Sequence, residues 1–293
     1  MPRYLTAQGF RAIGLGVDLS STLDSALEQH IASASALVNV ACAAPLDHDF
    51  RGGTVVDEPH EWDLGNKYRP ASNRVYPFHH PIVSVDELKI EMSNSPSVTL
   101  DATKLYVEPV QGYIEPISLV VTTIGIIPLS AIPLIGLRKP VAKVSYDYGW
   151  TFTVTDERLS ATGSKVYRAI NQFWSAADVE VKLNGTIVDP DDYTVDRVEG
   201  TITFDDLQDA ASQVTVSYVH TLPTAIAQAT AIIASDLIGY TNINASGLSG
   251  LSGIRVEEIE LRQSSKAGFI ATPVSSAAQA LLTPFKYITW VPS

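Results

Sequence analysis

The residues best suited to chemistry are acids and histidines on either side of residue 50. They are Asp47, His48, Asp49, Asp57, Glu58, His60 and Glu61. Carboxylates and imidazoles can bind a divalent metal or exchange protons, which would suit a metal hydrolase centred on His48. However, none of them has the H-E-x-x-H spacing of a helical zinc site, and the nearby Gly and Pro residues indicate a solvated loop. We therefore expect no catalytic residue, no metal and no other cofactor.

Other short motifs are better explained by backbone structure. His79 and His80 lie between prolines and indicate an extended segment that enters a strand at Ile82–Met92. Asn184–Gly185 and the acidic run 189–192 are typical of turns, and the run lacks the order of a calcium loop. The Gly-Ser repeat 246–253 precedes a strand-like sequence instead of a helix, so it is not a phosphate loop.

Composition excludes several classes of protein. The chain has 293 residues, enough for about two domains, and 45% of them are hydrophobic. Its 20 basic and 32 acidic side chains give a net charge of -12, which opposes a broad grip on nucleic acid. The single cysteine, Cys42, permits no intrachain disulfide, and the N-terminus lacks a secretory signal. Synthesis in a reducing cytoplasm is expected.

The run Ile117–Leu137 is uncharged and long enough to span a bilayer. Its Pro128, Pro133 and many β-branched residues favour extended structure and turns over one continuous helix. We expect no membrane span here. The open alternatives are a buried strand with a Pro-rich connection, and an apolar loop that packs against another subunit.

Three helices are predicted. Apolar residues at i, i+4 and i+8 from Leu23 to Ala41 predict a helix over about 21–43, starting at a capping box at Ser21 and Asp24. A second helix starts near Thr221 or Thr224 and ends about Gly239, and a short third one covers about 275–282. Helices separated by β-rich sequence indicate an α+β chain.

The β-rich sequence repeats itself. Segments 87–92, 105–108, 112–114 and 143–146 occur in the same order as 180–183, 193–196, 200–202 and 215–218. Each set contains a charged strand, a strand with a tyrosine, a glycine before the next strand, and a closing strand with Val-Ser-Tyr. This order predicts two copies of one antiparallel module.

Several motifs together resemble the head-tail connector proteins (adaptor or head completion proteins) of tailed bacteriophages. They are PIVSVDELKIEM at 81–92, Val-Ser-Tyr-x-x-Gly-Trp at 144–150, and the ending Leu281, Leu282, Pro284, Phe285 and Lys286. The resemblance covers about half of the chain. It implies an α+β fold in which a small bundle of three helices carries antiparallel β regions.

The chain is longer than typical members of that family. The excess lies mainly in 151–220, the second β copy, which we expect to be an inserted antiparallel β domain. Residues 1–150 and 221–293 would then form the helical and β adaptor core.

The resemblance also implies a function. Family members form a ring, with twelve copies as the expected number, between the portal protein and a tail terminator or the next neck protein. Genomic DNA passes through the centre without sequence-specific binding, and an acidic lumen would let it slide. The C-terminal tail would dock onto the portal through Phe285, Lys286, Tyr287, Ile288, Trp290 and Val291. The expected location is the virion neck, and the expected role is structural.

Two alternatives stay open at this point. The C-terminal tail would be a final strand within its own subunit if it docks on no partner. The protein would be a β-rich tail or baseplate accessory module that binds glycan or a fibre protein if aromatic residues such as Tyr106, Tyr113 and Trp174 are exposed.

Overall fold

A computed structural model describes most of the chain. The described residues are 2–15, 19, 22–45, 47–61, 74–92, 95–109, 112–117, 141–161, 165–209, 212–245 and 274–287. The chain forms two compact units, one made of Gly52–Trp150 and the other of Met1–Arg51 together with Thr151–Ser293. This division differs from the expected one, in which 1–150 and 221–293 form a core and 151–220 an insertion.

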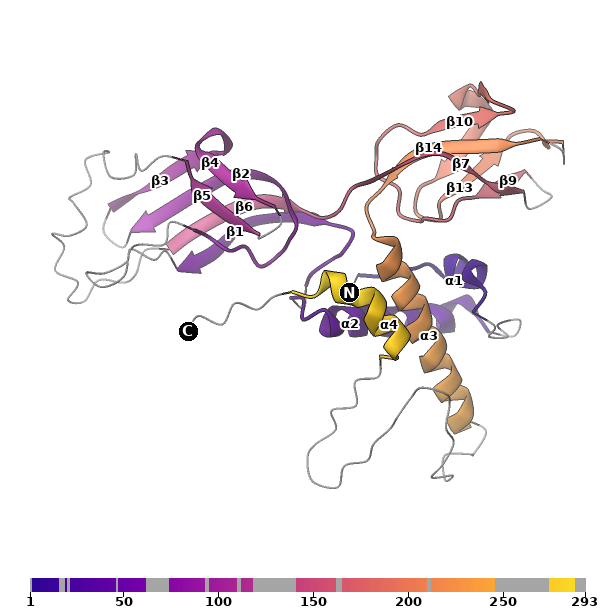
Figure 1. Cartoon of the computed structure of the whole chain (residues 1–293), viewed down its shortest axis with the longest axis horizontal. Coiled ribbons are helices and arrows are strands. Elements are labelled where there is room, and N and C mark those ends of the chain that lie inside the picture. Colours follow the sequence, from indigo (N-terminus) through magenta and orange to yellow (C-terminus); the bar gives the residue numbers. More distant parts are fainter. Residues whose placement is uncertain are drawn as a thin grey trace. The chain divides into compact units, whose positions relative to one another are not determined.

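The two ends of the chain build one helical domain (Figure 1). Its helices are α1 (Ala7–Ile13), α2 (Asp24–Ala41), α3 (Thr224–Ala245) and α4 (Ser276–Leu282). The apolar stripe of α2, including Leu27, Ile31 and Val38, is fully buried. It shares one core with α3, which contributes Ile226 and Ile233. Residues more than 180 positions apart thus close a single hydrophobic core, which stabilises both ends of the chain.

The helix ends differ from the sequence predictions. The sequence analysis did not predict α1, because this helix is short. Thr6 caps it by accepting a hydrogen bond from the Gly9 amide. The helix α2 begins after Leu23 without a side-chain cap, so the capping box predicted at Ser21 and Asp24 is wrong. The helix α3 continues past Gly239 to Ala245.

Residues 53–148 form the first β module, called module 1. Its strands are β1 (Gly53–Glu61), β2 (Ile82–Met92), β3 (Ser95–Asp101), β4 (Leu105–Glu108), β5 (Tyr113–Pro116) and β6 (Val141–Tyr148). One antiparallel sheet has the order β1-β6-β2-β3, and β4 pairs with β5. Val75 bridges to Ile114 of β5.

Residues 152–220 form the second β module, called module 2, which belongs to the same compact unit as the helices. Its strands are β7 (Phe152–Arg158), β8 (Ser160–Ala161), β9 (Val166–Arg168), β10 (Glu180–Leu183), β11 (Thr186–Ile187), β12 (Tyr193–Asp196), β13 (Thr201–Phe204) and β14 (Val214–His220). The sheets have the orders β11-β10-β14-β7 and β12-β13-β9-β8.

The predicted internal repeat is confirmed. Read from its first strand, module 1 has the order β1-β6-β2-β3 and module 2 the order β7-β14-β10-β11, so corresponding strands occupy corresponding places. A short 3-10 helix precedes β4 at Ala102–Lys104 and β12 at Pro190–Asp192. Both copies of Val-Ser-Tyr lie in the second strand of the sheet, β6 or β14.

The predicted fold class is wrong. The described residues are mostly β, with four antiparallel sheets and four α-helices, instead of a three-helix bundle with small β regions. The error arose because β1 and β7 were not recognised as strands. Both contain adjacent acidic residues, and β1 also contains a proline, which are uncommon in central strands but are tolerated at a sheet edge.

No helix in the described ranges is both long and apolar enough to cross a membrane. Of the apolar run Ile117–Leu137, all residues except Ile117 lie outside the described part. Ile117 itself is exposed.

Candidate functional site

A buried carboxylate organises module 1. Glu58 on β1 is 6% exposed, and its Oε2 accepts a hydrogen bond from the Tyr146 hydroxyl at 2.6 Å. Its Oε1 accepts the Phe78 amide at 2.8 Å and lies 2.6 Å from His60 Nε2. Burial alone would raise the pKa of Glu58, but these three hydrogen bonds outweigh burial and lower it.

A bulge in β1 aims this carboxylate inward. The register with β6 shifts between Val55 and Glu58, and Asp57 has a φ of 53°. The Asp57 amide, which the bulge removes from the ladder, donates to the Ser145 hydroxyl at 3.2 Å. The bulge thereby turns Glu58 toward Tyr146 on the neighbouring strand.

Module 2 repeats the hydroxyl and amide contacts of this arrangement, without a counterpart of His60. The Tyr218 hydroxyl donates to Glu157 Oε2 at 2.5 Å, and the Ile170 amide donates to Glu157 Oε1 at 2.7 Å. Asp156 has a φ of 50°, and its amide donates to the Ser217 hydroxyl at 3.1 Å. We call each set a Glu-Tyr lock: Glu58 with Tyr146, and Glu157 with Tyr218.

The locks have a sequence signal that the sequence analysis missed. Both acids end the pattern Thr-Val-x-Asp-Glu, at 54–58 and 153–157, and both tyrosines end Val-Ser-Tyr. Burial raises the pKa of Tyr146 and of Tyr218, and the adjacent carboxylate raises each further. The phenols therefore stay protonated as donors, so the locks are suited to holding the fold and not to transferring protons.

The acids and histidines that could have formed a metal centre belong to two different units. His48 is buried in the helical domain, and Asp49 pairs with Arg51 at 2.6 Å. Glu58 and His60 instead belong to the module 1 lock. Within the described ranges, no group of three or more His, Cys, Asp or Glu residues could hold a metal ion.

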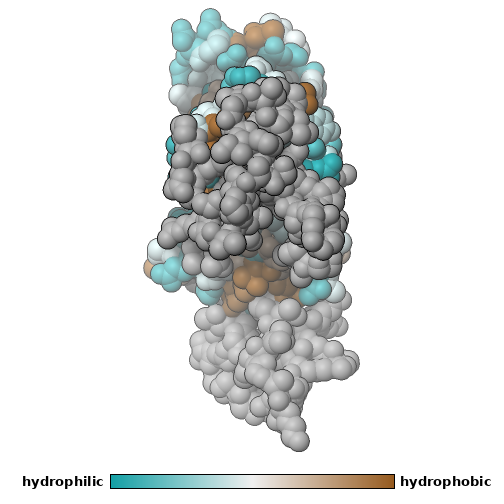
Figure 2. Space-filling model, turned by 90° about the vertical axis from the view of Figure 1, so that its left-hand side faces the viewer, coloured by the Kyte–Doolittle hydropathy of each residue, from teal (hydrophilic) through white to brown (hydrophobic). Residues whose placement is uncertain are grey.

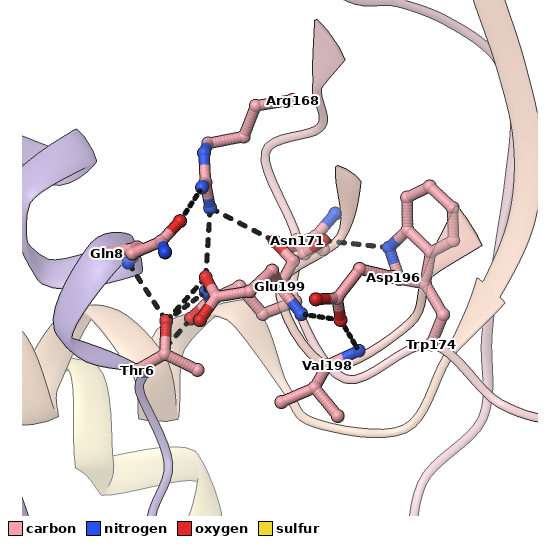
Figure 3. Close-up of polar contacts among 10 residues, drawn as sticks. Thr6, Gln8, Arg168, Asn171, Trp174, Asp196, Val198 and Glu199 are labelled. Atoms are coloured by element: carbon pink, nitrogen blue, oxygen red, sulfur yellow. Dashed lines mark hydrogen bonds and ion pairs between the residues drawn. The ribbon is translucent and has the colours of Figure 1, made fainter. Parts of the chain in front are cut away.

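A polar junction joins α1 to module 2 (Figure 3). The Thr6 hydroxyl donates to Glu199 Oε2 at 2.8 Å and accepts from Gln172 Nε2 at 2.6 Å. Arg168 pairs with Glu199 at 3.2 Å and donates to Gln8 Oε1 at 2.8 Å. Because Thr6 also caps α1, one hydroxyl fixes both the helix start and the module 2 contact.

The loop that carries Glu199 is itself held rigidly. Asp196 Oδ1 accepts the amides of Val198 and Glu199, each at 3.0 Å (Figure 3). Trp174 donates from Nε1 to the Asn171 carbonyl at 2.8 Å. Its ring stacks on the ring of Tyr218, with the two ring centres 4.2 Å apart. The junction is thus continuous with the module 2 lock through Tyr218.

An open cleft of about 360 Å³ lies beside the junction. Its cations are engaged, since Arg3 pairs with Glu28 at 2.9 Å and Arg51 pairs with Asp49. Arg51 also lies over the ring of Phe173, 5.3 Å from its centre. These contacts favour a structural joint between α1 and module 2 over a catalytic pocket.

Thr6 is the residue whose loss should weaken this joint most simply. Thr6→Ala removes the cap of α1, the hydroxyl that donates to Glu199, and the hydroxyl oxygen that accepts from Gln172. We expect it to lower the free energy of unfolding by about 1–2 kcal/mol. Urea denaturation measures this, with Thr155→Ala on the exposed edge of β7 as the matched control. Equal midpoints for the two variants would contradict the assignment.

The first C-terminal residues predicted to dock on a partner pack on their own helical domain. The Tyr287 amide donates to the Cys42 carbonyl at 2.8 Å, and its hydroxyl lies 3.0 Å from His48 Nδ1. The rings of Phe285 and Phe50 form a T-shaped pair with their centres 6.3 Å apart, whereas Lys286 is exposed. Ile288, Trp290 and Val291 lie outside the described residues.

The exposed aromatics expected for a glycan-binding module are mostly buried. Tyr113 is 8% exposed and Trp174 is 6% exposed, and only Tyr106, at 47%, is substantially exposed. The expectation of exposed rings at Tyr113 and Trp174 is therefore wrong. Both rings are used for packing within their modules.

No family model matches the chain, and no curated protein matches it in sequence.

Proposed function

We propose that this protein is a structural component of a tailed-bacteriophage particle that forms an oligomeric adaptor ring between portal and tail or neck. The observation that carries the proposal is the helical domain that both chain ends close, with the repeated β modules between those ends. The same order of helices, sheets and helices occurs together with the connector-like motifs at 81–92, 144–150 and 281–286.

The position of the C-terminal segment supports portal docking. Tyr287 and Phe285 attach the segment to α2 and the loop after it, which fixes where the chain leaves the helical domain. Lys286 is exposed at that point. In the proposed ring, Lys286, Ile288, Trp290 and Val291 contact the portal, while Phe285 and Tyr287 keep the segment in place.

The surface is also consistent with assembly. Large apolar side chains are exposed on the helical domain, with Leu23 75% and Val40 67% exposed. Figure 2 shows one face on which groups of hydrophobic residues lie between hydrophilic ones. Apolar side chains of this kind are candidates for burial between neighbouring subunits. The net charge of -12 would let DNA slide through the ring without sticking.

Removal of the protein from the infecting phage tests the function. Particles that lack the protein are expected to be filled or emptied capsids without tails, because no adaptor links portal and tail. Electron microscopy of purified particles measures this, with the wild-type gene supplied in trans as the control. Normally tailed particles without the protein would overturn the proposal.

A further inference from the structure

The helix α3 carries a single charged side chain, and this side chain has an unpaired oxygen. Asp236 is the only charged residue between Thr224 and Ala245. Its Oδ2 is buried and has no hydrogen-bond partner in the described part of the chain. Burial raises the pKa of Asp236, because no hydrogen bond or cation among the described residues favours its charged form. A donor or a cation supplied by another molecule would stabilise such a carboxyl group.

The surface of α3 around Asp236 is uncharged and partly open. Ile232 and Gly239 lie one turn before and one turn after Asp236, on the same side of the helix. Both are only partly buried, and a Cβ at Gly239 would meet no atom within 4 Å. Figure 1 shows that the C-terminal part of α3 extends past α2 and α4. We call Ile232, Asp236 and Gly239 the Asp236 face, which is accessible to another subunit.

The helical domain also has a cation without an acidic partner. Its arginines are engaged by acids of the same domain, in the pairs Arg3–Glu28, Arg11–Asp24 and Arg51–Asp49. Lys286 is exposed, and it forms no ion pair with an acid of the described ranges. Asp236 and Lys286 are therefore charges of opposite sign that the described helical domain leaves unpaired.

Lys286 lies beside an exposed apolar side chain. The amide of the next residue, Tyr287, donates to the Cys42 carbonyl at 2.8 Å, which holds Lys286 near the end of α2. Val40, in the last turn of α2, is 67% exposed. We call Val40 and Lys286 the Lys286 face. An apolar side chain and a cation on this face match the apolar side chain and the acid of the Asp236 face, and apolar contacts beside an ion pair exclude water from it.

We propose that the Lys286 face of one copy binds the Asp236 face of the next copy, with an ion pair between Lys286 and Asp236. The inference rests on the proposed ring and identifies the contact between its copies. Two different faces meet at each contact, and a head-to-tail contact of this kind can close into a ring. The stem of Lys286 can still contact the portal, because a lysine packs its methylene groups on one surface while its ammonium group reaches another.

Charge reversal tests the contact on the full-length chain mixed with the portal. Asp236→Lys places two lysines at every contact, and Lys286→Asp places two aspartates there. We expect either variant alone to need a concentration about fivefold higher than the wild-type chain to complete the ring. An equimolar mixture of the two variants should assemble like the wild-type chain, because opposite charges then meet when the variants alternate. The mass of the complex on the portal measures assembly.

Two control variants make the same changes of charge elsewhere. Asp178→Lys and Arg158→Asp alter exposed residues of module 2 and should assemble like the wild-type chain. Circular dichroism reports whether each variant folds. If Asp236→Lys does not fold, Lys286→Asp is compared with the double variant Asp236→Asn, Lys286→Asp. The double variant should assemble better than Lys286→Asp alone, because it lacks the repulsion between two aspartates.

The outcomes separate this contact from the ring itself. Assembly of the single variants at wild-type concentrations would overturn the contact and leave the ring standing. A mixture that assembles no better than its components would also overturn it, because an ion pair within one chain is broken in both variants and is not restored by mixing. A wild-type chain that forms no complex with the portal would overturn both the ring and the contact.

Discussion

Replacing Glu58 with alanine is expected to lower the free energy of unfolding of the unit 52–150 by about 3 kcal/mol. The substitution removes the acceptor of the buried Tyr146 hydroxyl and of the partly buried Phe78 amide. A buried donor without its acceptor costs about 1–3 kcal/mol. Hydrogen exchange resolved along the chain measures the effect, which should be greatest in β1, β2 and β6.

Two variants define the specificity of this effect. Glu91 lies on the same sheet, and its partly exposed side chain pairs with Lys143, so Glu91→Ala should keep hydrogen-exchange rates close to those of the wild-type chain. Glu157→Ala removes the corresponding acceptor in module 2, and its increased exchange should appear in β7 and β14 instead. Wild-type exchange rates in Glu58→Ala would show that the lock does not hold module 1.

The same carboxylate predicts how stability depends on pH. The pKa of Glu58 is lower in the folded chain than its ordinary value of 4.5. Its contribution to stability is therefore fully present above that value and is lost as the pH falls through the folded pKa. Glu58→Gln should remove this part of the acid dependence, and an unchanged acid transition in that variant would contradict the lowered pKa.

Gly200→Ala is expected to destabilise module 2 by about 3 kcal/mol. Gly200 has a φ of 63°, and a Cβ there would lie 2.3 Å from the Asn171 carbonyl oxygen. The backbone of the junction loop would have to move, which adds a packing cost to the strain of a left-handed alanine. Chemical denaturation measures the loss.

Gly185→Ala is the matched control for backbone strain. Gly185 also has a positive φ, 83°, but a Cβ there would meet no atom within 4 Å. Only the left-handed conformation is penalised, at a cost of about 1 kcal/mol. Equal losses in the two variants would show that the close approach of Gly200 to Asn171 does not matter.

Much of the scaffold could be predicted from local sequence. The stripe of α2 and the start of α4 follow from apolar spacing and a serine cap, and the repeat follows from the order of Tyr, Gly and Val-Ser-Tyr. The β1 and β7 strands were missed because Asp57 and Asp156 look like loop residues. Their positive φ values are stabilised by serine hydroxyls from a strand far along the sequence.

The partners of the site residues also could not be predicted from local sequence. His48 and Glu58 are close in sequence and of suitable chemistry for one centre, but their partners, Tyr287 and Tyr146, come from distant segments and assign them to different units. The junction of Thr6 with Glu199 joins residues 193 positions apart, which no spacing rule reveals.

The most direct test of the proposed function is the mass of a complex formed by mixing this protein with the portal of the same phage. We predict a complex in which many copies of the chain, twelve on a twelve-fold portal, join one portal ring. The complex should be lost when residues 288–293 are removed. A portal that stays unaltered in mass at saturating protein, or that takes up a single copy, would contradict the adaptor ring.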